Sequence, residues 1–138
     1  MLVLVDTPIW SLSLRRSAED LSPAQQRQTT ALRELIREGR AQLIGPVRQE
    51  LLSGVRQEKA FARLRDYLRA FDEPALDSAD YEDAAHIDNR CRSRGIAPTA
   101  IDVLICAVAA RRHWQIFTLD RDFTHYARVC PLTLLEVK

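Results

Sequence analysis

Residues 99–123, TAIDVLICAVAARRHWQIFTLDRDF, predict a buried helix followed by a short strand, and this pair decides the fold. Thr99 is a suitable N-cap, which places Asp102 in the first helical turn, where the helix dipole favours a carboxylate. Asp102 is the only polar side chain between Ile101 and Ala110, so we expect most of the helix surface to be buried. Residues 114–119 then form a predicted strand that ends beside further acids. A helix that begins with an acid and a strand that ends at acids together indicate a charged ligand.

Outward from this stretch, short apolar runs alternate with helical patterns. Strands are predicted at 2–5, 41–44, 75–76, 114–119 and 133–137, the last of them at a sheet edge. Helices are predicted after Asp6–Thr7–Pro8, from the capping box at Ser22 to Gly39, from Pro46 to Gly54, over 61–71, from Asp77 or Ser78 to Gly95, and from Thr99, with a short segment at 123–127. This alternation implies βαβ units and a mainly parallel sheet. We therefore expect a single domain, residues 1–138, folded as a three-layer α/β/α sandwich.

The composition points to an intracellular protein. No apolar run approaches the roughly 20 residues that span a bilayer, and the N-terminal MLVLV is too short for a signal peptide. The three cysteines form no CxxC pair, which is typical of free, buried thiols in a reducing compartment. We expect a cytoplasmic protein without a membrane association.

The charged residues are unevenly divided between types. The net charge is only +1, but of 20 basic residues only Lys59 and Lys138 are lysine, which leaves 20 − 2 = 18 arginines. Arginine binds phosphate through a planar fork, which suits a nucleic acid, although a genome that prefers arginine codons explains the bias equally well.

Four acids are placed where the carboxyl ends of parallel strands would gather them. Asp6 follows the first strand and Asp120 the strand at 114–119, while Asp102 and Glu50 lie on the helices that connect strands. Ligands bind beyond these strand ends in open α/β sheets. Each close pair of carboxylates repels by about 4 kcal/mol at an effective dielectric of 20, and a hard cation removes that repulsion. All-oxygen ligation suits Mg²⁺ or Mn²⁺, which beside a phosphate would activate water and stabilise the leaving oxygen.

Each acid also has a purely structural interpretation. Asp6 and Asp102 are placed as a helix cap and a dipole-complementing acid, Glu50 as a solvated helix residue, and Asp120 as a cap for the segment at Phe123. The four together indicate a site more strongly than any one of them does.

The ordered set of motifs resembles the PIN domain, and specifically the small VapC-type toxins of bacterial toxin–antitoxin pairs. The matching stretches are Val5-Asp6-Thr7, RQEL around Glu50, IDVLICAVA around Asp102, and FTLDRDF, which contains Thr118, Asp120 and Asp122. The resemblance covers essentially the whole chain in the family's order, although each motif is short.

The resemblance implies an Mg²⁺- or Mn²⁺-dependent endoribonuclease that hydrolyses phosphodiester bonds in RNA. It makes Asp6, Glu50, Asp102 and Asp120 the catalytic, metal-binding acids, with Asp6 and Asp102 holding the principal ion. Thr7 and Thr118 would orient carboxylates or solvent, and Asp122 would add a supporting carboxylate. Whether Asp120 or Asp122 is the fourth member stays open.

The resemblance also implies a homodimer and a cognate VapB-type antitoxin protein that lies across the acidic groove. Arginines near the acids are candidates for steering RNA, or equally for ordinary surface roles: Arg15, Arg16, Arg48 and Arg121. The histidines and cysteines are better interpreted as surface and core residues, respectively.

Two alternatives stay open: a non-catalytic PIN-like binding or scaffold module, and a metal-dependent nuclease that acts on DNA. Clustered like charges argue against the first, whereas carboxylate–metal chemistry does not read the 2′-hydroxyl that separates RNA from DNA. A haloacid-dehalogenase-like phosphatase is disfavoured because Asp6 is followed by Thr7 and Pro8 rather than by the second acid of a DxD motif.

Overall fold

The computed structural model describes the backbone of residues 1–138 and every side chain except that of Arg15. The helices are α1 (Thr7–Arg15), α2 (Pro23–Arg37), α3 (Gly45–Leu52), α4 (Glu58–Leu68), α5 (Ser78–Arg92), α6 (Ala100–Arg112) and α7 (Asp122–Tyr126), with a 3₁₀ turn at Ala18–Asp20. The strands are β1 (Val3–Val5), β2 (Ala41–Gln42), β3 (Gln115–Phe117) and β4 (Thr133–Leu134). Helices and short strands alternate as the sequence predicted.

The four strands form one sheet in the order β2-β1-β3-β4, and every pair is parallel. β1 lies in the middle, with Val3 opposite both Ala41 and Gln115. The chain leaves β1 toward β2 on one side, and later leaves β3 toward β4 on the other side. The carboxyl ends of β1 and β3 therefore border the topological switch point, where α/β sheets bind ligands.

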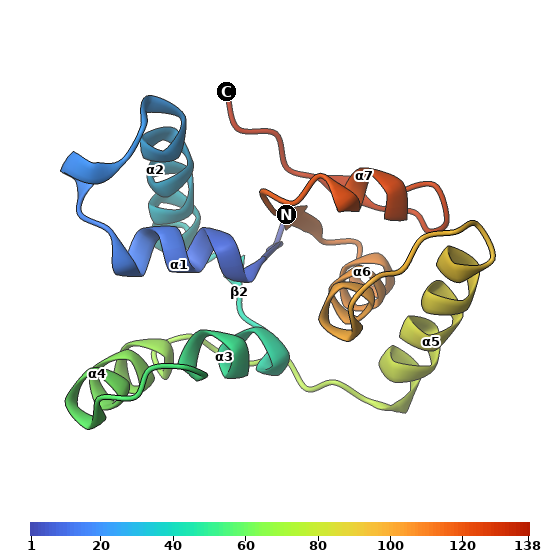
Figure 1. Cartoon of the computed structure of the whole chain (residues 1–138), viewed down its shortest axis with the longest axis horizontal. Helices are drawn as coiled ribbons and strands as arrows, with labels where there is room; N and C mark the ends of the chain where they lie inside the picture. The colour runs from blue at the N-terminus through green and yellow to red at the C-terminus, as the bar shows by residue number, and fades with distance from the viewer.

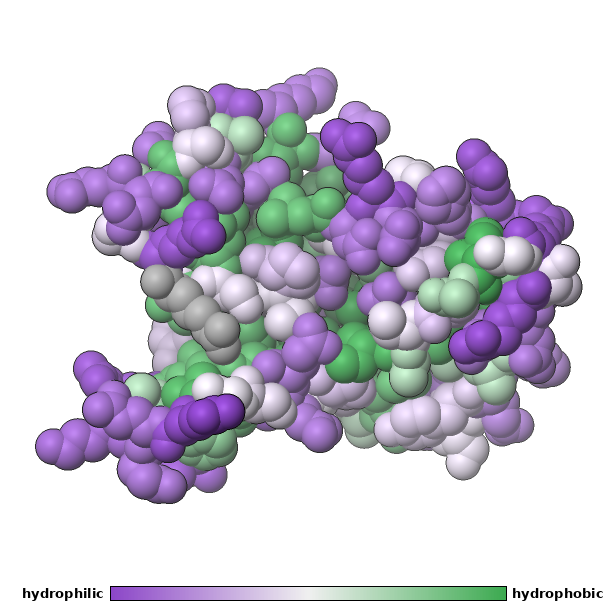
Figure 2. Space-filling view, viewed as in Figure 1, coloured by the Kyte–Doolittle hydropathy of each residue, from purple (hydrophilic) through white to green (hydrophobic). Residues whose placement is uncertain are grey.

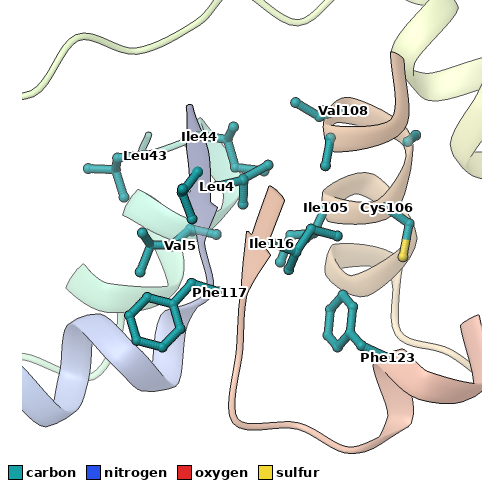
Figure 3. Close-up of a cluster of buried hydrophobic side chains, with 14 of the residues drawn as sticks. Leu4, Val5, Leu43, Ile44, Ile105, Cys106, Val108, Ile116, Phe117 and Phe123 are labelled. Atoms are coloured by element: carbon teal, nitrogen blue, oxygen red, sulfur yellow. The ribbon is translucent and has the colours of Figure 1, made fainter. Parts of the chain in front are cut away.

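Helices cover both faces of the sheet. In Figure 1, α1 to α4 lie to the left of the molecule and α5, α6 and α7 lie to the right. The close-up in Figure 3 shows how the core divides: Phe117 points toward α1 and α3, whereas Ile116 points toward Ile105 on α6 and toward Phe123. All four side chains are buried. The three-layer α/β/α class is thus confirmed, with helices packed on both sides of a parallel sheet.

One predicted strand is wrong. Residues 75–76 lie in the irregular connection between α4 and α5 and pair with no strand. The carbonyl of Ala75 instead accepts a hydrogen bond of 3.3 Å from Nη2 of Arg112. An apolar pair after a proline was too short to specify a strand, and a side chain on α6 supplies the partner that a neighbouring strand would have given.

The other strands are shorter than predicted: the structure has them at Val3–Val5, Ala41–Gln42, Gln115–Phe117 and Thr133–Leu134. Leu43 and Ile44 are buried but extend beyond the hydrogen-bonded ladder, and the chain turns into α3 at Gly45.

The capping box that starts α2 is confirmed, since Ser22 and Gln25 exchange side chain–backbone hydrogen bonds.

The three cysteines are free and buried, as predicted. No helix in the described part of the chain combines the length and the apolar character that a membrane span requires.

Figure 2 shows a recess on the left of the molecule, between the lobe of α1 and α2 and the lobe of α3 and α4, with hydrophobic residues visible around it.

Candidate active site

Asp6 lies at the crevice between β1 and β3. Its backbone N–H donates to the carbonyl of Phe117 at 2.9 Å, which extends the ladder by one residue, and its side chain caps α1. The Nε1 of Trp10 donates to the carbonyl of Val5 at 3.2 Å and holds the turn between strand and helix. The carboxylate is thereby fixed at the carboxyl end of the central strand, where only 5% of the residue is exposed.

Asp6 is joined to the end of β3 by a chain of hydrogen bonds. Thr118 donates its hydroxyl to Oδ2 of Asp6 at 2.7 Å, and the same Oγ1 accepts the N–H of Asp120 at 3.0 Å. Oδ1 of Asp120 in turn accepts the N–H of Asp122 at 2.9 Å. Thr118 therefore contacts the Asp6 carboxylate, and its role in orienting that group for catalysis stays a prediction. Asp120 also accepts the N–H of the first residue of α7, although the N-cap position of that helix is Arg121.

Asp102 lies in the first turn of α6, and Thr99 caps that helix by accepting the N–H of Asp102 at 3.1 Å. On the other side of the carboxylate, the hydroxyl of Tyr126 donates to Oδ2 at 2.7 Å. Burial raises the pKa of Asp102, the Tyr126 and Thr99 hydroxyls lower it, and the charges of Asp120 and Asp122 raise it again. Both acids of the β3–α7 segment are thus close enough to act on Asp102.

The pKa of Asp6 is affected by two of the other acids. Its pKa is raised first by burial, against the lowering effect of the hydrogen bonds from Thr118 and Thr7, and then by the charges of Asp102 and Glu50. Glu50 is exposed on α3 and lines a pocket of about 330 Å³ that also includes Ile101, the neighbour of Asp102. The structure therefore brings the four predicted acids into one electrostatic group, with Glu50 at its solvent-exposed side.

No arginine, lysine or histidine forms an ion pair with these acids among the side chains that the structure describes. Asp80, which is fully buried on α5, is the opposite case. Arg112 approaches it at 2.7 Å and Arg111 at 3.1 Å, and hydrogen bonding to Arg112 lowers the pKa of Asp80 to about 2. The same chain neutralises one buried carboxylate with two arginines and leaves Asp6 without a cation.

The residues suit a hydrated divalent cation rather than a closed metal cage. Within the described residues, no three His, Cys, Asp or Glu side chains are close enough together to form a ready-made metal cluster. Mg²⁺ keeps several waters and binds through one or two carboxylates, so a complete protein shell is not required. Oγ1 of Thr7, which neighbours Asp6, is buried without a hydrogen-bond partner among the described groups, so it is free to bind a ligand or solvent beside that carboxylate.

One of the candidate RNA-binding arginines is already paired with an acid. Arg48 is held by Glu73, with Nε to Oε1 at 2.7 Å, and also donates to the carbonyl of Phe71. Arg16 and Arg121 are exposed, the latter between Asp120 and Asp122. The side chain of Arg15 lies outside the described residues. Arg16 and Arg121 therefore stay open as predictions, whereas Arg48 already has an acidic partner.

Sequence reasoning missed Tyr126, which contacts Asp102 directly, and the Asp80 cluster. Tyr126 follows Phe123 by three residues, a helical spacing that indicates a buried face but does not reveal a hydroxyl directed at Asp102.

In the comparison with protein families, the PIN domain model matches residues 3–129. Comparison with curated protein sequences gave no match.

Solved structures share the fold at low sequence identity. The chain is similar to a chain of VapBC2 from Rickettsia felis bound to a DNA fragment from their promoter, with a TM-score of 0.74, 15% identity, and coverage of 99% of this chain and 98% of the other. It is similar to a chain of FitAcB from Neisseria gonorrhoeae, with a TM-score of 0.72, 20% identity and coverage of 98% and 97%. It is also similar to a chain of a toxin–antitoxin complex from Klebsiella pneumoniae, with a TM-score of 0.66, 18% identity and coverage of 88% and 89%.

Proposed function

Because the chain belongs to the PIN domain family, whose members are generally nucleases, we propose that it is a VapC-type toxin: an endoribonuclease that requires Mg²⁺ or Mn²⁺ and is inhibited by a cognate antitoxin. The proposal assigns Asp6, Asp102, Glu50 and Asp120 to the reaction. It goes beyond the family in naming the ion, the RNA substrate and the inhibitor.

The observation that carries the proposal is the contrast between Asp6 and Asp80. Both are buried aspartates, but Asp80 is paired with two arginines, whereas Asp6 has other acids as its charged neighbours. A buried, unpaired carboxylate next to like charges is unfavourable, and its raised pKa reflects this. Such an arrangement persists at functional sites, where a bound cation supplies the missing charge.

In this proposal the acids bind the ion and the protein supplies no nucleophile. When bound, a divalent cation supplies Lewis-acid activation of water and stabilises charge on the scissile phosphate. Asp6, after β1, and Asp102, in the first turn of α6, would hold the principal ion, and Asp120 and Glu50 would complete the site. Asp122 supports Asp120 through the hydrogen bond from its N–H.

The substrate approaches at the exposed side of this site. Glu50 and Asp120 are exposed, and so is Arg121, which is placed to attract a phosphate next to them. Single-stranded RNA is the proposed substrate because the chain resembles the VapC-type toxins, and protein recognition of RNA mostly targets unpaired segments.

The proposed antitoxin partner would bind at the same acidic surface. An antitoxin segment that offers an arginine would satisfy the unpaired acids and exclude both ion and RNA. The solved structures with the same fold support an antitoxin partner, since they include toxin–antitoxin complexes. We extend the proposal to a homodimer, which light scattering of the purified protein tests.

Cleavage of total cellular RNA by the purified protein tests the function. Reactions with Mg²⁺, Mn²⁺ or EDTA are compared for the wild type, Asp6→Asn and Asp102→Asn, with Asp66→Asn as a matched acid on the remote helix α4. We expect discrete fragments that require metal, disappear with Asp6→Asn and Asp102→Asn, and persist with Asp66→Asn.

Other results would redirect the assignment. Metal-dependent cleavage of single-stranded DNA but not of RNA would make the protein a DNA-directed nuclease. Absence of cleavage of either nucleic acid, in a protein that binds Mn²⁺, would favour the non-catalytic module.

A further inference from the structure

Tyr126 is a buried residue whose only polar side-chain atom is directed at the acidic site. The residue is 2% exposed, and its hydroxyl donates to Oδ2 of Asp102 at 2.7 Å. A buried tyrosine hydroxyl needs a hydrogen-bond partner, and a backbone carbonyl is sufficient for that purpose. Here the partner is instead a carboxylate of the candidate active site, 24 residues away in sequence.

The position of this hydroxyl is fixed by its surroundings. The ring of Tyr126 packs edge-on against that of Phe123, with centroids 5.0 Å apart and an interplanar angle of 75°. Both the thiol and the N–H of Cys130 donate to the carbonyl of Tyr126, at 3.3 and 3.1 Å. The tyrosine is therefore held at its ring and at its backbone, and its hydroxyl meets Asp102 in a determined place.

Tyr126 also joins the two halves of the site. α7 begins at Asp122, directly after the loop that carries Asp120, and ends at Tyr126. At one end of this segment Thr118 contacts Asp6, and at the other end Tyr126 contacts Asp102. Residues 118–126 therefore form a strap that links the carboxylate after β1 to the carboxylate at the start of α6.

A neutral donor has a specific advantage in this position. Arg111 and Arg112 hold Asp80 but also cancel its charge. A tyrosine hydroxyl orients one oxygen of a carboxylate and leaves the full negative charge for a cation. Hydrogen-bonded partners of metal ligands fix ligand orientation in this way in other metal sites.

We propose that Tyr126 is a positioning residue that orients the Asp102 carboxylate for a divalent cation. This inference rests on the proposed function, since it assumes that Asp102 binds the ion. It adds a residue from α7 to the site and assigns the short helix the task of holding that residue.

Titration calorimetry with Mn²⁺ alone, without RNA, tests the inference independently of activity. The proteins are the wild type, Tyr126→Phe, Asp102→Asn and the double variant, with Tyr81→Phe as a matched control on α5, where the residue is 53% exposed. Tyr126→Phe keeps the buried ring, and thermal unfolding of each variant verifies the fold. We expect Tyr126→Phe to weaken Mn²⁺ binding by about 10-fold or more, the range for lost partners of metal ligands.

The double variant separates positioning from general stabilisation. If Tyr126 acts through Asp102, the Tyr126→Phe change has no further effect on Mn²⁺ affinity once Asp102 is asparagine. Equal Mn²⁺ affinity of wild type and folded Tyr126→Phe overturns the inference while leaving the proposed function intact. An equal loss in both backgrounds also overturns it, since the loss would then not pass through Asp102. Absence of Mn²⁺ binding by the wild type overturns both.

Discussion

The hydroxyl of Thr118 donates a 2.7 Å hydrogen bond to Oδ2 of Asp6, across 112 residues of sequence. This contact joins the ends of the two central strands, and it leaves Asp6 ionisable because the donor is neutral. The site is therefore organised by hydroxyl groups, from Thr118 on one side and Tyr126 on the other, rather than by cations.

Replacement of Thr118 by valine removes the donor to Asp6 and the acceptor for the N–H of Asp120. We expect Thr118→Val to lower the free energy of unfolding by about 1–3 kcal/mol, the usual effect of leaving a buried polar group unpaired. We also expect weaker Mn²⁺ binding. Urea denaturation and calorimetry measure the two effects.

Two controls accompany this variant. Thr118→Ser keeps the hydroxyl and should retain Mn²⁺ binding, and Thr124→Val removes an exposed hydroxyl that donates only to the carbonyl of Arg121. If Thr118→Ser binds Mn²⁺ as weakly as Thr118→Val, the methyl group of Thr118, and not its hydrogen bond, is needed for Mn²⁺ binding.

Ionisation of Asp6 should lower the free energy of unfolding of the metal-free protein as the pH rises. The pKa of Asp6 is raised above its ordinary 3.8, so the stabilising contribution is complete below pH 3.8 and is lost as the pH rises through the folded-state value. With EDTA, we expect Asp6→Asn to become increasingly stable relative to wild type as the pH rises above 3.8, until the Asp6 carboxyl is ionised in the folded protein. Urea denaturation across this range measures the difference. Parallel curves for the two proteins would contradict the assignment.

Addition of Mn²⁺ should reverse that difference. A ligand that binds only the folded state at 100 times its Kd stabilises it by about 2.7 kcal/mol. We expect this increase in the free energy of unfolding for wild type at pH 7 and little or none for Asp6→Asn. Equal stabilisation of both proteins would place the ion elsewhere.

Asp80 should contribute to the free energy of unfolding with the opposite pH dependence to Asp6. Its pKa is lowered to about 2, so its contribution is present above its ordinary 3.8 and is lost as the pH falls through about 2. We expect Asp80→Asn to be destabilised by about 3 kcal/mol at pH 7, as for a broken buried pair, and the gap to narrow on acidification. Urea denaturation measures both. Asp83→Asn, which removes an exposed partner of Arg111 at 3.4 Å, should change stability by less than about 1 kcal/mol.

The thiols should be unreactive in the native protein. Cys91 and Cys106 are fully buried and burial raises the pKa of Cys91, while Cys130 is 7% exposed. The contact with Cys106 lowers the pKa of Cys130, so burial rather than a lack of thiolate protects that residue. We expect no rapid reaction with a disulfide reagent until the protein is unfolded, when all three react. Fast labelling of one cysteine in the native protein would show that the packing around that residue opens.

Local signals in the sequence determined most of the elements and the identity of the main acids. The Ser22 capping box, the N-cap at Thr99 and the apolar run before Asp6 involve neighbours within a few residues, so their patterns are legible without a structure. The predicted strand at 75–76 is wrong because two apolar residues do not specify a partner.

Tertiary structure alone decided which groups meet. Nothing local indicates that Thr118 donates to Asp6, that Tyr126 donates to Asp102, or that Arg111 and Arg112 neutralise Asp80. These contacts join segments 24 to 112 residues apart, and they depend on the strand order that places β3 beside β1. The sequence by itself determined which carboxylates are present. The packing of α6 against α5 gave Asp80 its arginines, and the packing of β3 and α7 gave Asp6 and Asp102 neutral donors instead. Local sequence does not encode these contacts, on which burial and neighbouring charge depend.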